Sequence, residues 1–319
     1  MLAVKAHGLV KKFKQTCAIQ DLDLEIETGT LAGLIGPDGA GKSTLLRLLI
    51  GLLRPTEGRV EIAGFDAVKK PFQVKERIGY MPQHFSLYGD LSVAENMKFF
   101  ADLYGVKEER FAARKAELLK FSALGPFEDR LARNLSGGMQ KKLALACNLF
   151  HTPEILLLDE PTTGVDPVSR QELWRLLTEL HEQGATILMT TPYMDEAARC
   201  GQVGFINEGR ILAYDSPENL TAGMKDEIAE LVAPLEPSLK ALKGMLGLKS
   251  VHPFGETIHI VLTAGEQGLE NVREKLEAEK IAVKSLRKIP PSFEDVFLAL
   301  AQRENNPPSP PFRKGGNEK

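Results

Sequence analysis

The residues with the most specific chemistry in this 319-residue sequence form a glycine-rich loop that ends in Lys42, Ser43 and Thr44. The loop follows the pattern G-x-x-x-x-G-K-[ST], in which glycines let successive backbone N–H groups point into one concavity that suits a polyphosphate. Lys42 is expected to reach the β- and γ-phosphates, and the Ser43 hydroxyl to ligate Mg²⁺. The predicted phosphate-binding residues are Gly36, Pro37, Asp38, Gly39, Ala40, Gly41, Lys42, Ser43 and Thr44.

The segments on either side of this loop support that interpretation. An apolar run of strand length, Thr30–Ile35, precedes it, and leucines at helical spacing follow it from Leu45 to Leu53. A strand, a glycine loop and a helix in this order direct the N-terminus of the helix at a bound anion. A chance glycine turn is therefore the weaker interpretation.

A pair of acids forms the second candidate group. Asp159 and Glu160 follow the apolar run Ile155–Leu158, which is typical of a buried parallel strand. Functional groups cluster at the C-terminal ends of such strands, so we expect Asp159 to hold Mg²⁺ through water and Glu160 to polarise an attacking water. A surface acid pair after a strand is common, but it loses weight when a phosphate loop precedes it.

Three further signals are weaker when each is taken alone. Gln83 follows a predicted strand and can offer its carbonyl oxygen to Mg²⁺ or water, although a loop glutamine is usually only solvated. Ser136, Gly137 and Gly138 precede a predicted helix and form either a second anion-binding terminus or an ordinary N-cap. Phe13 follows two lysines and either stacks on a purine base or serves as a core or edge aromatic.

The remaining patterns predict an α/β protein with more than one domain. Residues 2–27 alternate apolar and polar side chains as in an antiparallel β-region, and a helical insertion occupies about residues 84–150. Beyond about residue 220 we expect a small C-terminal α+β extension, with strands Thr257–Leu262 and Ile281–Leu286, a helix Gln267–Glu279 and a helix capped by Ser292. The expected domains are 1–220, 221–303 and a disordered tail, 304–319.

Composition narrows the possible partners. Hydrophobic residues make up 43% and charged residues 26% of the chain, which is ordinary for a globular protein. The net charge of −3 gives no reason to expect a nucleic-acid partner. No apolar run approaches the roughly 18 residues of a membrane span, so we do not expect the chain itself to cross a membrane. Cys17, Cys147 and Cys200 are isolated and are expected to be reduced thiols.

With these pieces in order, the sequence resembles the nucleotide-binding subunits of ATP-binding cassette (ABC) transporters from residue 3 to about 220. The resemblance rests on five motifs in the family's order. These are the phosphate loop (Walker A), the Q-loop at Gln83, the signature at Leu135–Gln140, the Walker B strand at Ile155–Glu160 and the D-loop at Thr163–Asp166. It implies a P-loop NTPase core with an antiparallel β-subdomain, and it places Phe13 where the family stacks an aromatic ring on adenine.

The resemblance also implies a mechanism. Two such domains, identical or different, sandwich two ATP molecules, and each site combines one subunit's phosphate loop with the other's Ser136-Gly137-Gly138. The implied catalytic residues are Glu160, Gln83 and Lys42, and the implied Mg²⁺ ligands are Ser43, Gln83 and Asp159. Dimer closure and hydrolysis would drive integral-membrane permease subunits through the groove near the Q-loop.

Two further stretches, Leu87–Asn96 and Pro291–Phe297, look like those of bacterial drug-type exporters. This implies a peripheral subunit at the cytoplasmic face of the bacterial inner membrane that exports drug-like or lipophilic substrates. Two alternatives stay open, a soluble mechanochemical ATPase of the same family and a mainly regulatory nucleotide-binding module.

One residue departs from the family's pattern. After Thr190-Thr191 the family places a histidine that contacts the γ-phosphate, whereas this sequence has Pro192, which carries neither a side-chain donor nor a backbone N–H. Losing one donor to a developing charge lowers a rate by about 10²–10³. We therefore expect strong ATP binding and weakened hydrolysis, unless a hydroxyl of Thr191 or Tyr193 replaces the histidine.

Overall fold

The computed structural model describes residues 1–84, 86–224, 226–262 and 268–304. The chain divides into two compact units, Met1–Asp215 and Ser216–Lys319, a few residues before the boundary expected near residue 220. The predicted disordered tail lies outside the described residues, apart from residue 304.

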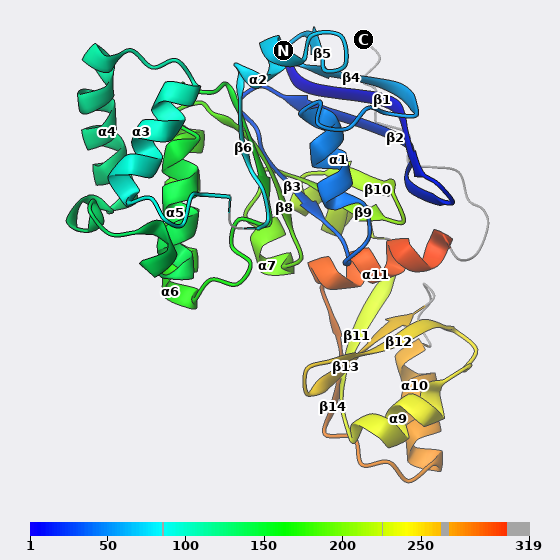
Figure 1. Cartoon of the computed structure of the whole chain (residues 1–319). Helices are drawn as coiled ribbons and strands as arrows, with labels where there is room; N and C mark the ends of the chain where they lie inside the picture. Colours follow the sequence, from blue (N-terminus) through cyan, green and yellow to red (C-terminus); the bar gives the residue numbers. More distant parts are fainter. Residues whose placement is uncertain (85, 225, 263–267, 305–319) are drawn as a thin grey trace. The chain divides into compact units, whose positions relative to one another are not determined.

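The first unit contains two sheets (Figure 1). Its antiparallel sheet has the order β2-β1-β4-β5, formed by β1 (Leu2–Phe13), β2 (Thr16–Glu27), β4 (Glu57–Ile62) and β5 (Phe65–Asp66). The predicted antiparallel β-region is thus confirmed. The six-stranded sheet has the order β10-β9-β3-β8-β7-β6, formed by β3 (Leu31–Ile35), β6 (Ile78–Met81), β7 (Ile155–Asp159), β8 (Thr186–Thr191), β9 (Gln202–Asn207) and β10 (Arg210–Asp215). All of its neighbouring pairs are parallel except β9 and β10.

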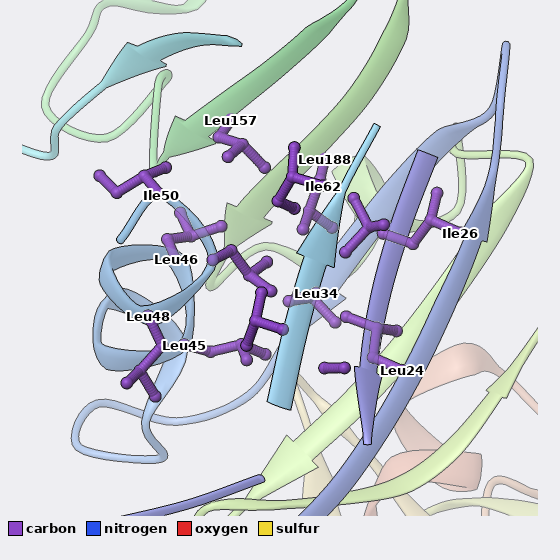
Figure 2. Packing of buried hydrophobic residues seen from close by; sticks show 14 of the residues in the cluster. Leu24, Ile26, Leu34, Leu45, Leu46, Leu48, Ile50, Ile62, Leu157 and Leu188 are labelled. Atoms are coloured by element: carbon purple, nitrogen blue, oxygen red, sulfur yellow. The ribbon is translucent and has the colours of Figure 1, made fainter. Parts of the chain in front are cut away.

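The core of this unit lies around helix α1 (Lys42–Leu49), between strands of the two sheets (Figure 2). Leu45 and Leu46 of α1 pack in one buried cluster with Leu34 of β3, Ile62 of β4 and Leu157 of β7. Every residue of β3, β7 and β8 is buried, which explains the apolar runs Leu31–Ile35, Ile155–Leu158 and Ile187–Met189 within them. This core fixes the C-terminal ends of the strands that carry the predicted site.

Helices α3 (Val93–Leu103), α4 (Glu108–Ser122) and α5 (Gly137–Cys147) form the predicted helical insertion. Ser92 and Glu95 form a capping box at the start of α3, and Ser136 caps α5. The other helical segments of this unit are α2 (Pro71–Lys75), η1 (Gly125–Phe127), η2 (Ala132–Asn134), α6 (Pro167–Glu182) and α7 (Met194–Ala197). Within the described residues, no helix combines the length and the apolar character needed to cross a membrane.

The second unit is built around a β-α-β-β-α-β module. Its antiparallel sheet has the order β12-β13-β11-β14, and the elements are β11 (Glu227–Val232), α9 (Leu235–Leu242), β12 (Leu248–Phe254), β13 (Thr257–Leu262), α10 (Gly268–Ala278) and β14 (Ser285–Ile289). Leu242, Val272 and Leu276 of the helices pack on Leu231 and Ile260 of the strands. Helices α8 (Pro217–Ala222) and α11 (Phe293–Glu304) flank the module in sequence.

The strand predicted at Ile281–Leu286 is wrong in position, because the strand runs from Ser285 to Ile289. Ile281 and Val283 are apolar because they pack on the core from the connection that precedes the strand. The strand at Thr257–Leu262 is confirmed, and so is the cap at Ser292, whose hydroxyl accepts a hydrogen bond from the backbone N–H of Asp295.

Candidate active site

The phosphate loop joins β3 to α1, and its glycines are required for two different reasons. Gly39 and Gly41 have φ of +81° and +104°, in the region that favours glycine. Gly36 has an ordinary φ, but a Cβ there would lie 2.0 Å from the carbonyl oxygen of Ile206. A Cβ at Gly41 would also lie 2.6 Å from the carbonyl oxygen of Ala18. The spacing of the motif therefore reflects both backbone conformation and close packing on neighbouring strands.

Lys42 lies at the first position of α1 with its side chain buried. Its Nζ donates to the carbonyl oxygens of Gly36 (2.8 Å) and Pro37 (3.1 Å), and it lies 3.5 Å from Glu160 Oε1. A buried ammonium group beside the N-terminus of a helix makes this loop favourable for an anion. The loop therefore fits the triphosphate of a nucleotide.

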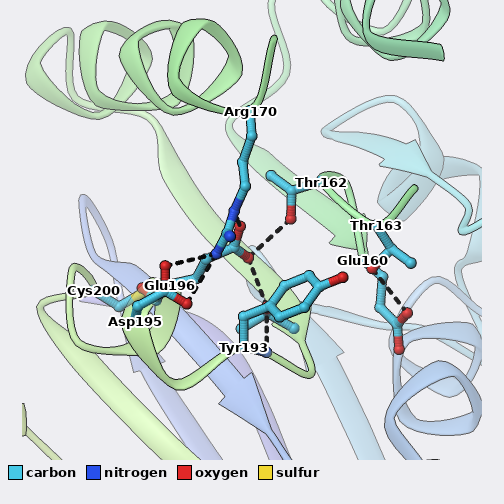
Figure 3. Close-up of polar contacts among 9 residues, drawn as sticks. Glu160, Thr162, Thr163, Arg170, Tyr193, Asp195, Glu196 and Cys200 are labelled. Atoms are coloured by element: carbon cyan, nitrogen blue, oxygen red, sulfur yellow. Dashed lines mark hydrogen bonds and ion pairs between the residues drawn. The ribbon is translucent and has the colours of Figure 1, made fainter. Parts of the chain in front are cut away.

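Glu160 is the point at which the predicted catalytic residues meet. Its Oε2 accepts hydrogen bonds from Gln83 Nε2 (2.8 Å) and Thr163 Oγ1 (3.2 Å), and Lys42 approaches the other carboxylate oxygen. Figure 3 shows the contact between Glu160 and Thr163. Glu160 has a backbone φ of +48°, which is unusual for a residue other than glycine. Such a conformation costs of order 1–3 kcal/mol and tends to occur at functional sites.

Asp159, the last residue of β7, supplies the observation that fits a cation. Its Oδ1 accepts a hydrogen bond from Thr190 Oγ1 at 2.8 Å, whereas its buried Oδ2 has no hydrogen-bond partner among the described residues. A buried carboxylate oxygen needs a partner, and oxygen ligands suit Mg²⁺. The predicted ligands of this ion are Asp159, Ser43, which is the second residue of α1, and the side-chain oxygen of Gln83, whose Nε2 donates to Glu160.

The structure adds Lys141, which the sequence interpretation missed. This half-buried lysine of α5 donates from Nζ to the carbonyl oxygen of Gln83 at 2.8 Å and lies 3.5 Å from that of Glu160. Burial lowers the pKa of Lys141, against the opposing effect of the Asp159 and Glu160 carboxylates. No feature of the sequence distinguished Lys141 from its neighbour Lys142.

The signature residues lie at the start of α5. Ser136 Oγ accepts a hydrogen bond from the backbone N–H of Met139 at 3.3 Å, so the predicted cap is confirmed. Ser136 and Gly137 are exposed, while Gly138 is buried against α6, where a Cβ would lie 2.3 Å from Ser169 Cβ. These contacts account for the cap and for Gly138, whereas a Cβ at the exposed Gly137 would meet only the Gly164 carbonyl oxygen, at 3.4 Å.

Phe13 is the last residue of β1, next to a turn, and 44% of its surface is exposed. The Nζ of Lys11 lies 5.0 Å from the centroid of the ring. The ring therefore does not lie in the core, and it is exposed enough to stack on a base.

A buried cluster surrounds Glu196, close in sequence to Pro192 (Figure 3). Glu196 Oε2 accepts hydrogen bonds from Thr162 Oγ1 (2.9 Å) and Thr191 Oγ1 (2.6 Å), and Oε1 accepts one from Arg170 Nε (2.6 Å). The cluster joins Thr162, just before the D-loop, and Arg170 of α6, after it, to the end of β8 and to α7. Only tertiary contacts reveal it, because its members are separated in sequence.

These contacts show how far each of two hydroxyls is able to replace the histidine that the family pattern places at position 192. Thr191 is fully buried, its hydroxyl donates to Glu196, and its Oγ1 also accepts a hydrogen bond from the backbone N–H of Tyr193. It cannot serve a phosphate without breaking these bonds. Tyr193 is 37% exposed, with the guanidinium of Arg170 4.6 Å from its ring centroid. Tyr193 is therefore the better candidate of the two.

The fold and the site together define a nucleotide-binding protein of the P-loop class. Its mostly parallel six-stranded sheet carries a phosphate loop at the end of β3 and an acid pair at the end of β7. Comparison with known families matches residues 19–163 to the family described as ABC transporter. The chain belongs to the ABC transporter family, as its relatives also show.

Two relatives illustrate the similarity. Over 93% of its length the chain is 41% identical to the probable multidrug ABC transporter ATP-binding protein YbhF of Escherichia coli (strain K12), and it spans about half (52%) of that protein. Over 93% of its length it is also 34% identical to the daunorubicin resistance ATP-binding protein DrrA3 of Streptomyces coeruleorubidus, of which it covers 95%.

A solved structure supports the fold. The ATP-binding cassette MJ0796, in a dimeric post-hydrolysis state bound to ADP and Pi, matches with a TM-score of 0.62 and 27% identity. The match covers 67% of this chain and 98% of that one. The predicted cassette fold is thus confirmed.

Proposed function

We propose that this chain binds and hydrolyses ATP with Mg²⁺ as the motor subunit of an exporter. The observation that carries the proposal is the convergence of Lys42, Gln83 and Thr163 on the buried carboxylate of Glu160, beside the phosphate loop. Such a carboxylate is positioned to accept a proton from an attacking water. The loop N–H groups and Lys42 would hold the phosphates.

In this proposal three groups of residues bind Mg²⁺, activate the water and bind the adenine ring, respectively. Asp159 and Ser43 hold Mg²⁺, which supplies positive charge to the phosphate oxygens when bound. Glu160 orients and polarises the water, and Gln83 holds Glu160 in position and links it to the Q-loop. Phe13 stacks on the adenine ring.

We also propose that the working form contains a second cassette, identical or different. The exposed Ser136 and Gly137 at the start of α5 support this, because their N–H groups can face a phosphate held by the other subunit. The dimeric state of the solved cassette MJ0796 is consistent with it.

The proposed membrane partner is a permease that docks on the helical insertion. Tyr88, Phe99 and Leu103 are 50%, 38% and 65% exposed, and the rings of Tyr88 and Phe99 lie 4.6 Å apart. We call these three residues the insertion patch. An exposed apolar patch that follows the Q-loop in sequence suits a helix of a membrane protein. Such docking would hold the chain at the cytoplasmic face of a bacterial inner membrane.

The names of the two relatives, a multidrug and a daunorubicin resistance protein, support drug-like or lipophilic cargo.

We also propose that ATP hydrolysis in the chain's own site is slow, because of the residue at position 192. Pro192 offers no donor, and the Thr191 hydroxyl already donates to Glu196. A partner cassette that carries the histidine would compensate.

The proposal is tested with the chain co-expressed with permeases encoded by neighbouring genes. Glu160→Gln should abolish ATP hydrolysis and leave ATP binding intact, because the loop and Lys42 are unchanged. Leu103→Asp should prevent co-purification with the permease, whereas Leu52→Asp, at an exposed apolar residue outside the insertion patch, should not. A chain that binds none of these permeases would instead support the soluble mechanochemical ATPase.

Position 192 has its own test. Pro192→His in the purified complex should raise the ATPase rate by about 10²–10³ if a single missing donor limits hydrolysis. Tyr193→Phe in the unmodified chain should lower the rate if the tyrosine hydroxyl replaces that donor. An unchanged rate in Pro192→His would show that the proline does not limit turnover.

A further inference from the structure

Lys141 is the residue through which α5 reaches the catalytic end of β7. It lies in the second turn of the helix that begins after Ser136, and its side chain runs to the carbonyl oxygen of Gln83 (2.8 Å), with that of Glu160 at 3.5 Å. Its ammonium group therefore touches the backbone of two segments whose side chains bind each other.

Comparison with Lys142, the next residue of α5, shows that the contact with Gln83 is specific to Lys141. Lys142 is more deeply buried than Lys141, and its Nζ pairs with Glu172 Oε2 of α6 at 2.8 Å. Successive residues of a helix point about 100° apart, so two adjacent lysines bind different neighbours. Lys142 ties α5 to α6, and Lys141 ties α5 to the Q-loop and to Glu160.

We propose that Lys141 is a positioning residue that couples the two ATP sites of the dimer. This proposal rests on the proposed function, in which Ser136 and Gly137 serve the ATP held by the partner subunit. A displacement of the start of α5 by that ATP is transmitted along a rigid helix to Lys141. From there it reaches Gln83 and Glu160 of the chain's own site.

The chemistry of lysine suits this role. An ammonium group has three donors and can bind two carbonyl oxygens at once, and it adds positive charge beside the Asp159 and Glu160 carboxylates. Hydrogen bonds that involve a charged donor are stronger than neutral ones, and the 2.8 Å bond from Lys141 to the Gln83 carbonyl oxygen is of this kind. Arginine would keep the charge and the donors, whereas methionine would keep only the length of the side chain.

The test compares Lys141→Met, Lys141→Arg and the control Lys142→Met in the complex with its permease. Lys141→Met should lower kcat about tenfold, the effect expected from losing a hydrogen bond to a charged group. It should also bring the Hill coefficient for ATP close to 1 and leave ATP binding by the isolated chain within about twofold of the original. Lys141→Arg should largely restore kcat and cooperativity, and Lys142→Met should leave cooperativity unchanged.

A second readout does not need turnover. Hydrogen exchange of the peptide that covers residues 78–84 should slow when ATP is added to the original chain and to Lys142→Met. It should not slow in Lys141→Met. If Lys141→Met matches Lys142→Met in cooperativity and in exchange, or if Lys141→Met loses ATP binding, the positioning role is overturned. If no variant hydrolyses ATP but exchange behaves as stated, the proposed hydrolysis fails and the coupling stands.

Discussion

The contact between Gly138 and Ser169 offers a sharp test of how α5 packs on α6. An ideal Cβ at Gly138 would lie 2.3 Å from Ser169 Cβ and 2.4 Å from Ser169 Oγ, much closer than atoms in contact. Gly138→Ala must therefore push the two helices apart. The preceding glycine is a matched control, because a Cβ at Gly137 would meet nothing closer than the Gly164 carbonyl oxygen at 3.4 Å.

The magnitude follows from two opposing effects. Overpacking a tight contact costs about 1–3 kcal/mol of unfolding free energy. Replacing glycine by alanine in a helix gains up to about 1 kcal/mol, and this gain is shared by Gly137→Ala. The difference in unfolding free energy between Gly138→Ala and Gly137→Ala should therefore be about 1–3 kcal/mol, with Gly138→Ala the less stable variant.

Urea denaturation followed by tryptophan fluorescence measures this difference. The chain has a single tryptophan, Trp174, which is buried on α6 beyond Ser169, so the signal reports on the first unit although the chain has two. Adding Ser169→Gly to Gly138→Ala should recover stability, because it removes the atoms that clash. Equal stability of Gly138→Ala and Gly137→Ala, or no recovery in the double variant, would refute the packing argument.

Two further predictions concern the segments around the D-loop. Glu196→Ala should destabilise the first unit by about 1–3 kcal/mol, since it removes the acceptor of the buried Thr162 and Thr191 hydroxyls, while Arg170 keeps its hydrogen bonds to Asp195. Urea unfolding checks this, and Glu196→Gln, which keeps a carbonyl acceptor, should lose less stability. The Asp166 carboxylate accepts capping hydrogen bonds from the backbone N–H groups of Ser169 and Val168, and these bonds lower the pKa of Asp166. The stabilisation that this cap gives the fold is therefore present above the unfolded pKa of about 4, and it is lost as pH falls through the lower pKa of the folded state. Asp166→Asn should flatten the fall of the urea midpoint below about pH 4, and an unchanged pH profile would contradict this assignment.

The parts of the site that the sequence predicted are those set by local physics. The loop from Gly36 to Thr44 depends on glycine conformation, the strand before Asp159 on a continuous apolar run, and the start of α5 on the capping hydroxyl of Ser136. Each of these signals lies within a few residues of the feature that it predicts. The structure confirms the loop, the strand and the cap.

The features that the sequence did not reveal depend on contacts between distant segments. Lys141 and Lys142 have the same side chain, and only the packing of α5 sends one to Gln83 and the other to Glu172. Glu196 meets Thr162 and Arg170 only because β7 and β8 are neighbours in the sheet. In the second unit, Ile281 and Val283 pack on the core from the connection before β14, and their apolar pattern led to the wrong strand position.

Glu160 is held from several directions at once, and this determines what a change at position 192 can do. Lys42, Gln83 and Thr163 contact its carboxylate, and its backbone N–H donates to Thr190 Oγ1 at 3.0 Å. Pro192 follows β8, in which Thr190 accepts the Glu160 N–H and Thr191 donates to Glu196, but Pro192 itself takes part in neither hydrogen bond. Pro192→His should therefore change the rate of hydrolysis with little change in unfolding free energy, since none of the contacts that hold Glu160 involves it. A variant that gained rate only together with a large loss of stability would show that the two clusters are not separate.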